Sequence, residues 1–265
     1  MTTTLTRLAA ASKDRAEREM AERPLAQFEE IIETLPPVRP FGARLRREAG
    51  PLPRVIAELK RASPSAGVMR SSYSPLLIAR GYTRVGAAAL SVLTEPEEFG
   101  GSLDHLHEVR PAHLPILRKD FLVTPYQIAQ SRVAGADAVL LIAAILEAAS
   151  LGVMMHAARR YGIEALVEIH DASELDRAIE MGATMIGVNN RDLATMQVDL
   201  DTCVRLAPRL PAGVVAVAES GIRGRADVDR ILQAGYAAIL VGEALMKSPD
   251  PGDALWRLLQ PAEPA

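Results

Sequence analysis

Cysteine, aromatic side chains and long apolar runs are all scarce in this sequence of 265 residues. Cys203 is the only cysteine, so the chain cannot form an internal disulfide, which fits a reducing compartment. Nothing around Cys203 resembles a nucleophile motif. Aromatic residues make up 4% of the chain, too few for the stacking platforms on which single-stranded nucleic acids bind.

A strong net charge and a targeting segment are also missing. The chain has 30 basic and 33 acidic residues, and a net charge of −3 provides no electrostatic footprint for nucleic acid or an anionic membrane. No stretch of about 18 apolar residues could span a bilayer. Lys13, Asp14 and Arg15 interrupt the region where a signal peptide has its apolar core. We therefore expect a cytoplasmic protein with no nucleic-acid partner and no membrane partner.

The part of the chain after residue 53 alternates short aliphatic runs with longer helical segments. The runs predict eight strands, at 54–60, 88–93, 115–119, 137–142, 164–169, 184–188, 214–218 and 237–241. Each interval between them is long enough for one helix, which is the pattern of βα units in a parallel sheet.

An internal repeat indicates how these units are arranged. The segments "VGAAALSVL" at 85, "AGADAVLLI" at 134, "MGATMIGVN" at 181 and "AGYAAILVG" at 234 each end a helix on a glycine and enter a buried strand. Their spacing of about two βα units marks alternate strands, and a regular fourfold repeat suits a closed eight-stranded barrel better than an open sheet. We predict an α/β protein with a single (βα)8 TIM barrel.

The first 50 residues differ from the barrel sequence. Leucine, isoleucine and phenylalanine recur there at three- and four-residue steps, which predicts one or two helices, and "FGARLRREAG" predicts a third that ends at Gly50. We assign residues 1–50 to an N-terminal helical extension packed on the barrel. Residues 51–265 form the barrel, one domain with the extension.

Charged residues gather where the predicted strands end. "RVIAELK" finishes a buried run with Glu58 and Lys60, whose side chains point to the same face because they are two residues apart. Lys119, Glu168 and Glu219 stand at the ends of three further strands. Active sites of (βα)8 barrels form at this end. Charges beside an apolar interior persist only when they are paired or used, so these residues predict an acid–base site.

A second group of strand-end residues predicts a phosphate site. "AESGIRG" and "LVGEALM" each place a glycine where one of the last two strands meets a helix. Backbone N–H groups at these two loops form the usual phosphate site of a barrel. Ser220, Gly221, Gly242 and Glu243 would contribute mainly through their main chain.

Together these motifs resemble the indole-3-glycerol phosphate synthase family of tryptophan biosynthesis. The resemblance covers residues 25 to 258 and rests on "IAELKRASPSAG", "LSVLTEPEEFGGS", "PILRKDF", "ALVEIHD", "IGVNNRDL", "AESGI" and "LVGEALM". It implies the conversion of 1-(2-carboxyphenylamino)-1-deoxyribulose 5-phosphate into indole-3-glycerol phosphate, carbon dioxide and water. The family implies no metal and no organic cofactor.

The resemblance also implies roles for individual residues. Lys119 would be the general acid that protonates the substrate ketone, and Glu168 the general base of the dehydration. Lys60 would hold the substrate and protonate the departing hydroxyl, and Glu58 and Glu219 would position the lysines. The remaining implied residues are Asn189, Arg191 and Ser220 as polar contacts, Ser63, Gly221, Gly242 and Glu243 near the phosphate, and Phe99 and Phe121 around the aromatic ring. Residue spacing alone leaves open which lysine serves which proton.

Other interpretations of the residues were weighed. His105, His107 and His113 suggest a metal, but His105 and His107 are two apart on a predicted helix and do not share a face. A sugar-phosphate isomerase or epimerase would need other strand-end groups, and a barrel that only binds a ligand would not need the lysine–glutamate set. We expect Arg223 and Arg225 at the surface, and a monomer whose partner is a phosphorylated small molecule.

Overall fold

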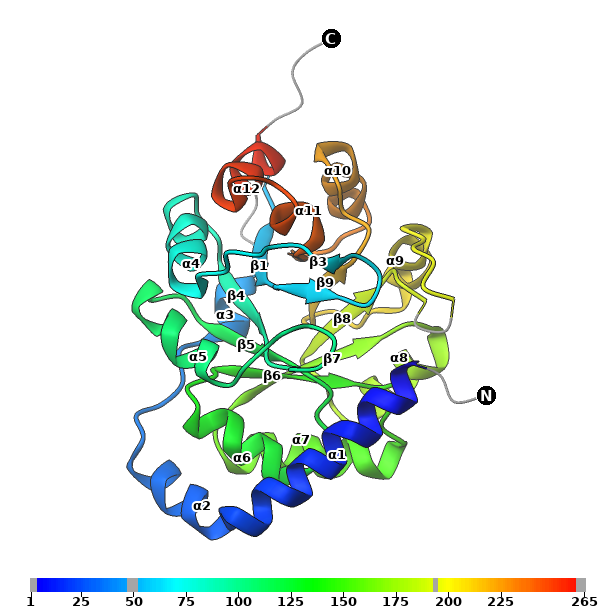
Figure 1. The fold of residues 1–265 in the computed structure, drawn as a ribbon. Helices are drawn as coiled ribbons and strands as arrows, with labels where there is room; N and C mark the ends of the chain where they lie inside the picture. Colours follow the sequence, from blue (N-terminus) through cyan, green and yellow to red (C-terminus); the bar gives the residue numbers. More distant parts are fainter. Residues whose placement is uncertain (1–3, 47–51, 193–194, 261–265) are drawn as a thin grey trace.

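The computed structural model describes residues 4–46, 52–192 and 195–260. Within these ranges, eight parallel strands close into a barrel (Figure 1). They are β1 (Arg54–Leu59), β4 (Ala89–Leu93), β5 (Ile116–Lys119), β6 (Ala138–Ile142), β7 (Glu164–Ile169), β8 (Met185–Asn189), β9 (Val215–Glu219) and β10 (Ala238–Val241). Neighbours in sequence pair in this order, and β1 pairs with β10 to close the ring. The predicted barrel is confirmed, and every predicted strand boundary lies within one residue of the observed one.

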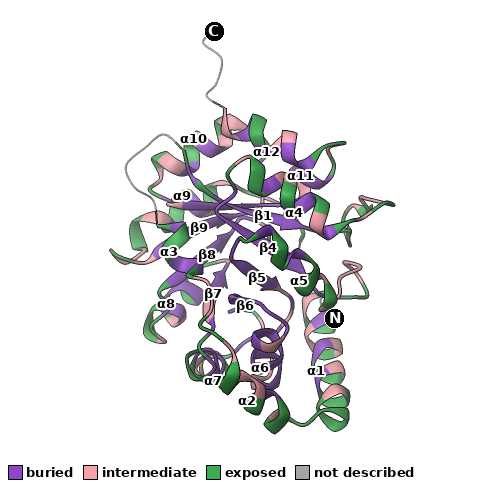
Figure 2. Ribbon diagram, turned by 90° about the vertical axis from the view of Figure 1, so that its left-hand side faces the viewer, coloured by how far each residue is buried: buried purple, intermediate pink, exposed green. Residues whose placement is uncertain are grey.

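Helices follow the barrel strands and cover the outer side of the barrel (Figure 2). They are α4 (Pro75–Arg84), α5 (Asp104–Val109), α6 (Pro125–Val133), α7 (Ala148–Arg160), α8 (Ala172–Glu180), α9 (Asp201–Leu206), α10 (Arg225–Gln233), α11 (Glu243–Met246) and α12 (Pro251–Leu259), with 3₁₀ turns η1 (Arg110–Ala112) and η2 (Ala207–Arg209). Their boundaries follow local chemistry. In α8, Asp171 Oδ1 accepts a hydrogen bond from the backbone N–H of Glu174 at 2.8 Å, which caps the helix.

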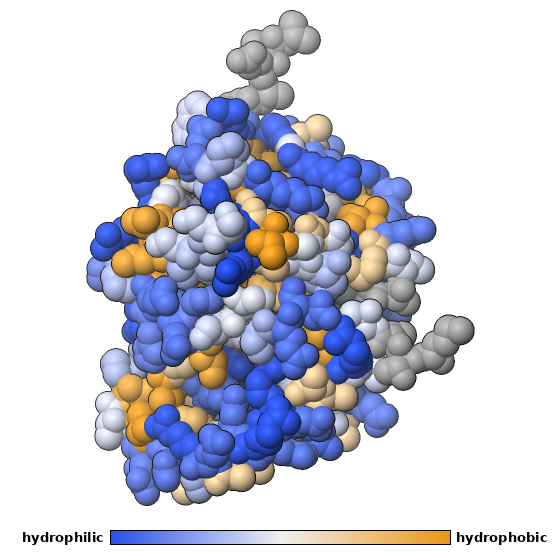
Figure 3. Space-filling model, viewed as in Figure 1, coloured by the Kyte–Doolittle hydropathy of each residue, from blue (hydrophilic) through white to orange (hydrophobic). Residues whose placement is uncertain are grey.

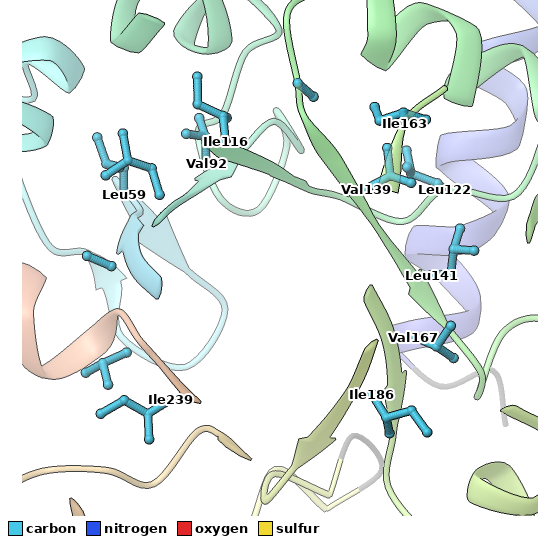
Figure 4. Close-up of a cluster of buried hydrophobic side chains, with 14 of the residues drawn as sticks. Leu59, Val92, Ile116, Leu122, Val139, Leu141, Ile163, Val167, Ile186 and Ile239 are labelled. Atoms are coloured by element: carbon cyan, nitrogen blue, oxygen red, sulfur yellow. The ribbon is translucent and has the colours of Figure 1, made fainter. Parts of the chain in front are cut away.

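Side chains on each strand alternate between the barrel interior and the layer under the helices. Figure 4 shows outward residues such as Leu59, Val92 and Ile186 packed in the outer layer. The interior cluster is separate, and in β5 the inward residues are Leu117 and Lys119. Because this alternation has a period of two, it decides which strand-end residues can face a ligand.

The amino-terminal end of the barrel is closed by the short helix α3 (Phe41–Leu45). Phe41 and Leu45 are fully buried in the interior cluster. Glu164, at the start of β7, accepts hydrogen bonds from the backbone N–H groups of Phe41 at 2.7 Å and Gly42 at 3.1 Å. The segment before β1 is therefore both a hydrophobic plug and a hydrogen-bonded clip on the barrel.

The other N-terminal helices, α1 (Thr4–Glu22) and α2 (Leu25–Thr34), lie along the side of the barrel at α6 (Figure 1). Polar contacts hold α1 there: Gln127 Nε2 donates to Ser12 Oγ at 2.8 Å, and Arg15 lies 3.5 Å from Asp120. The predicted third helix is present as α3, but its predicted end at Gly50 is wrong, because α3 ends at Leu45 and Arg46 is already extended. The predicted domain boundary falls within residues 47–51, outside the described residues. The division into extension and barrel stays a prediction.

A short antiparallel pair, β2 (Ala62–Ser63) and β3 (Gly67–Val68), interrupts the loop after β1 and was not predicted. The surface is mixed, and on the face in Figure 3 apolar side chains form small groups among hydrophilic ones. Among the described residues, no helix is long and apolar enough to cross a membrane.

We predict that Glu164→Ala lowers the free energy of unfolding by about 2–4 kcal/mol, because two hydrogen bonds to a charged acceptor are lost and two buried N–H groups lose their partner. Urea denaturation followed by circular dichroism measures the change. Glu180→Ala, at an exposed position of α8, is the matched control and should change stability by less than about 0.5 kcal/mol. Equal effects in both variants would contradict the role of the clip.

Candidate active site

Five titratable side chains, here called the mouth cluster, meet at the carboxyl end of the barrel: Glu58, Lys60, Lys119, Glu168 and Glu219. Lys119 Nζ lies 2.8 Å from Glu168 Oε2 and 3.5 Å from Glu219 Oε2. Lys60 Nζ donates to Glu58 Oε1 at 2.7 Å. These residues come from β1, β5, β7 and β9, so the closed barrel brings together charges that are far apart in the sequence.

Glu168 and Glu219 both contact Lys119, but their surroundings shift their pKa values in opposite directions. Burial raises the pKa of Glu168, but the charges of Lys119 and His170 outweigh it, and the pKa is lowered overall. Burial raises the pKa of Glu219, and the charge of Glu168 adds to this against the opposing Lys119, so its pKa is raised. Burial lowers the pKa of Lys119, but Glu168, Glu219 and Glu58 raise it overall. The site thus holds an ammonium acid and an ionised base side by side.

Two glycines make room for the carboxylates of the cluster. A Cβ at Gly187 in β8 would lie 2.1 Å from Glu219 Oε1, and a Cβ at Gly242 would lie 2.3 Å from Glu58 Oε1. Both contacts are far inside van der Waals distance. Any side chain at these two positions would displace a carboxylate that contacts a lysine, so the glycines are part of the site's geometry.

The mouth cluster opens into a cavity of about 670 Å³. All residues predicted for the site line this cavity: Glu58, Lys60, Ser63, Phe99, Lys119, Phe121, Glu168, Asn189, Arg191, Glu219, Ser220, Gly221, Gly242 and Glu243. The sequence prediction required a common cavity for Lys60, Lys119 and Glu168, and the structure has one.

An aromatic pair forms one side of the cavity. The ring centroids of Phe99 and Phe121 are 6.2 Å apart with planes at 44°. The buried Glu95 holds the Phe99 loop, because its carboxylate accepts from the backbone N–H groups of Glu97, Glu98 and Phe99 at 2.8–3.1 Å. The pair offers an apolar surface of the size of an aromatic ring.

The opposite side of the cavity is polar and cationic. Ser220 and Gly221 adopt left-handed backbone conformations, with φ of 63° and 81°, in the turn after β9. Arg191 lies 3.3 Å from the carboxylate of Glu243, and Lys247 lies 2.6 Å from it. The side chain of Glu243 therefore contacts two cations. The sequence analysis assigned Glu243 a role mainly through its main chain and did not predict these ion pairs.

Two arginines near the strand ends have partners outside the mouth cluster. Arg118, the residue before Lys119 in β5, points outward and bonds Thr94, Asp120 and Gln130. It precedes the inward Lys119, so the two-residue alternation excludes it from the mouth. Arg225 is partly buried, not a free surface residue, because it bonds Asp229 and main-chain carbonyls of the last helix.

Some residues that line the cavity were not predicted as site residues from the sequence. Leu5 and Leu8 of α1 line it, so the first helix borders the mouth. Their helical spacing was visible, but nothing in it showed which surface they would contact. Lys247 and the exposed Arg223 also line the cavity. Arg223 was expected at the surface, and its contribution to the cavity rim was not foreseen.

The histidines near α5 do not form a metal centre. His105 packs edge-on against Tyr73, with ring centroids 5.3 Å apart. In the described part of the chain, no group of three or more histidine, cysteine or acidic side chains could hold a metal ion. Cys203 is buried, and burial raises the pKa of its thiol to about 12, which does not suit a nucleophile.

A closed (βα)8 barrel with paired lysines and glutamates at its mouth, beside an aromatic wall and a cationic rim, defines an enzyme class: barrel enzymes that act by acid–base catalysis on an anionic substrate. A family model described as indole-3-glycerol phosphate synthase matches residues 5–258. The chain belongs to the indole-3-glycerol phosphate synthase family.

Individual relatives agree with the family model. An indole-3-glycerol phosphate synthase of Pelodictyon phaeoclathratiforme is 48% identical over 246 residues, covering 92% of this chain and 96% of the relative. Another, of Albidiferax ferrireducens, is 46% identical over 264 residues, covering 99% of this chain and 100% of the relative. The solved structure of 3-hexulose-6-phosphate synthase from Salmonella typhimurium has a TM-score of 0.61 at 16% identity, covering 78% of this chain and 98% of that one. This last likeness shows the fold alone.

The raised pKa of Glu219 predicts a pH-dependent stability difference. The folded protein keeps this proton over a pH range, upward from about 4.5, in which the unfolded chain releases it. Wild type therefore loses stability through this group as pH rises, by roughly 1.4 kcal/mol for each unit by which the pKa is raised. We expect Glu219→Gln to be more stable than wild type at about pH 8, with the difference shrinking toward about pH 4.

Urea denaturation at several pH values measures this difference. Glu33→Gln, at an exposed position of α2, serves as the control and should show no such trend. A Glu219→Gln variant that gains stability relative to wild type as the pH is lowered would show that the pKa of Glu219 is shifted in the other direction.

Proposed function

We propose that this protein converts 1-(2-carboxyphenylamino)-1-deoxyribulose 5-phosphate into indole-3-glycerol phosphate, carbon dioxide and water. Family membership supports the reaction. The single observation that carries it is the placement of Lys119, a half-buried ammonium held between the buried Glu168 and Glu219. An acid with an adjacent base is what ring closure and dehydration require.

In the first step, the aromatic ring carbon of the substrate attacks its ketone carbon. We assign Lys119 as the general acid that protonates the ketone oxygen. Three carboxyl groups raise the pKa of Lys119, so the amine is protonated before the reaction begins. Phe99 and Phe121 line the cavity where the carboxyphenyl ring would stack. Loss of carbon dioxide then restores the aromatic ring.

The second step removes water. We assign Glu168 as the general base, because it is the ionised carboxylate beside Lys119. Lys60 protonates the departing hydroxyl, held in place by its bond from Nζ to Glu58 Oε1. Glu219 positions Lys119 from its other side. Asn189 lies next to Glu219 in the strand register and shares the cavity with the mouth cluster.

The phosphate of the substrate belongs at the opposite, cationic side. Arg191 is a cation on that side, and Glu243 positions it. We propose that the backbone at Ser220 and Gly221, and at Gly242 and Glu243, contributes N–H groups to the phosphate oxygens, with Ser63 at the edge. The positive charge and the main-chain donors together suit a dianion.

We further propose a cytoplasmic monomer that binds no nucleic acid. The residues assigned to the reaction above belong to this chain, so the proposed mechanism uses no residue of a second copy. Sedimentation velocity at the concentrations of the activity assay should give the mass of one chain. Activity that falls on dilution, together with a larger mass at high concentration, would contradict this proposal.

Lys119→Gln is expected to lower kcat by roughly 10²–10⁴-fold, the effect typical of a lost acid–base group. Glutamine keeps a hydrogen-bond donor for Glu168 but has no transferable ammonium proton. The assay follows the fluorescence of the indole product from the carboxyphenylamino substrate.

Lys13→Gln, at an exposed position of α1, is the matched control and should keep the wild-type rate. Circular dichroism checks that Lys119→Gln is folded. A wild-type protein that makes no fluorescent product would overturn the function, and a folded Lys119→Gln variant with near wild-type kcat would overturn the role of Lys119.

A further inference from the structure

The first helix extends from the side of the barrel to the mouth. The buried residues of α1 are Leu8, Ser12 and Ala16, one on each turn, so a single stripe of the helix faces the barrel. In the middle of that stripe, Ser12 Oγ accepts from Gln127 Nε2 of α6 at 2.8 Å. Toward the start of the helix, Leu5 and Leu8 line the main cavity. The helix therefore forms part of the cavity wall as well as part of the barrel's side.

One ion pair of α1 holds the loop after β4. Arg7 pairs with Glu98, the residue immediately before Phe99. The carboxylate of Glu95 fixes the inner shape of this loop through three backbone N–H groups, but Glu95 belongs to the same loop. From the side of β1, the backbone N–H of Ala62 donates to the carbonyl oxygen of Phe99 at 3.2 Å. The contact from Arg7 therefore fixes the place of the Phe99 loop relative to α1.

A second ion pair of α1 holds the start of the loop after β5. Arg15 Nη2 lies 3.5 Å from Asp120 Oδ1, and the same oxygen accepts from the backbone N–H of Phe121 at 2.8 Å. The other oxygen of Asp120 accepts from Thr94 and Arg118. Burial raises the pKa of Asp120, but these partners and Arg15 outweigh it and lower the pKa overall. Asp120 is therefore an ionised link between Arg15 and the backbone of Phe121.

The two ion pairs, Arg7–Glu98 and Arg15–Asp120, are here called the brace. The two arginines are eight residues apart, about 12 Å along the helix axis, so α1 connects the loop after β4 with the loop after β5. The ring centroids of the phenylalanines that follow the two acids are 6.2 Å apart. Neither arginine lines the cavity, and in the described part of the chain neither forms an ion pair with the mouth cluster. The brace therefore contacts the loops of the aromatic pair and not the charged groups of the site.

We propose that Arg7 and Arg15 are positioning residues for the aromatic ring of the substrate. Through their acidic partners they hold the two phenylalanine loops at the spacing that receives the carboxyphenyl ring, and Leu5 and Leu8 add an apolar side to the same subsite. The brace acts on the binding of the ring and not on proton transfer, which the mouth cluster performs. The proposal rests on the proposed function.

Steady-state kinetics of Arg7→Glu test the first pair. The variant replaces an attraction by a repulsion at Glu98, so we expect the KM of the carboxyphenylamino substrate to rise by roughly threefold to tenfold. The value of kcat should stay within about twofold of wild type, because a loss that is equal in the ground state and the transition state changes KM alone. Arg18→Glu makes the same charge change at an exposed position of α1, and this control should keep the wild-type KM.

A charge swap tests whether Arg7 acts through Glu98. Glu98→Arg alone should raise KM as Arg7→Glu does, whereas the double variant, with the two charges exchanged, should return KM to within about twofold of wild type. A general loss of helix stability would not be reversed by a second substitution in a different loop.

Arg15 is tested without a swap, because its partner Asp120 is buried with Arg118. Arg15→Gln should raise KM by roughly twofold to fivefold with kcat near the wild-type value. Arg15→Lys keeps the charge and should raise KM less. Thermal unfolding checks that all variants are folded.

The outcomes separate the brace from the function itself. A wild-type protein without product formation defeats the proposed function. With an active wild type, an Arg7→Glu variant that has the wild-type KM overturns the role of Arg7, and so does a charge swap that leaves KM as high as in the single variants. An Arg15→Gln variant with the wild-type KM overturns the role of Arg15. Variants that lower kcat and leave KM unchanged overturn the proposal as a whole.

Discussion

The interaction on which the site depends is the contact of one half-buried lysine with two buried carboxyl groups. Lys119 loses hydration at the barrel mouth, and Glu168 and Glu219 in contact with it, together with Glu58, keep its charge favourable there. The pKa values of the two carboxyl groups differ because burial and the charge of Glu168 raise that of Glu219 against the opposing Lys119, whereas Lys119 and His170 outweigh burial at Glu168 and lower its pKa. An acid, a base and a carboxyl group that holds its proton thus lie within one cavity.

The barrel makes this contact possible by holding strand ends at fixed distances. Glu168 and Glu219 sit on β7 and β9, with Gly187 of β8 between them, and only a glycine leaves space for the Glu219 carboxylate. The interior below is filled by aliphatic side chains and sealed by Phe41 and Leu45 at the far end. Stability therefore resides at the amino-terminal end of the strands, and the chemistry resides at the carboxyl end.

Much of this arrangement was accessible from the sequence, and the reasons are local. Side chains two residues apart on a strand point to the same face. The sequence therefore predicts that Glu58 and Lys60, at the end of an aliphatic strand, project on the same side. Glycines before four of the strands revealed the repeat and hence the closed barrel. The same alternation applies to β5, where it turns Arg118 outward and Lys119 inward.

By itself, the sequence determined where the strands lie and which polar residues stand at their ends, since both follow from local periodicity. Only the tertiary structure decided which charges meet and that α1 borders the cavity through Leu5 and Leu8. These features depend on distances between segments far apart in the chain. The differing pKa values of Glu168 and Glu219 belong to the same class, because desolvation and neighbouring charge exist only once the barrel has closed.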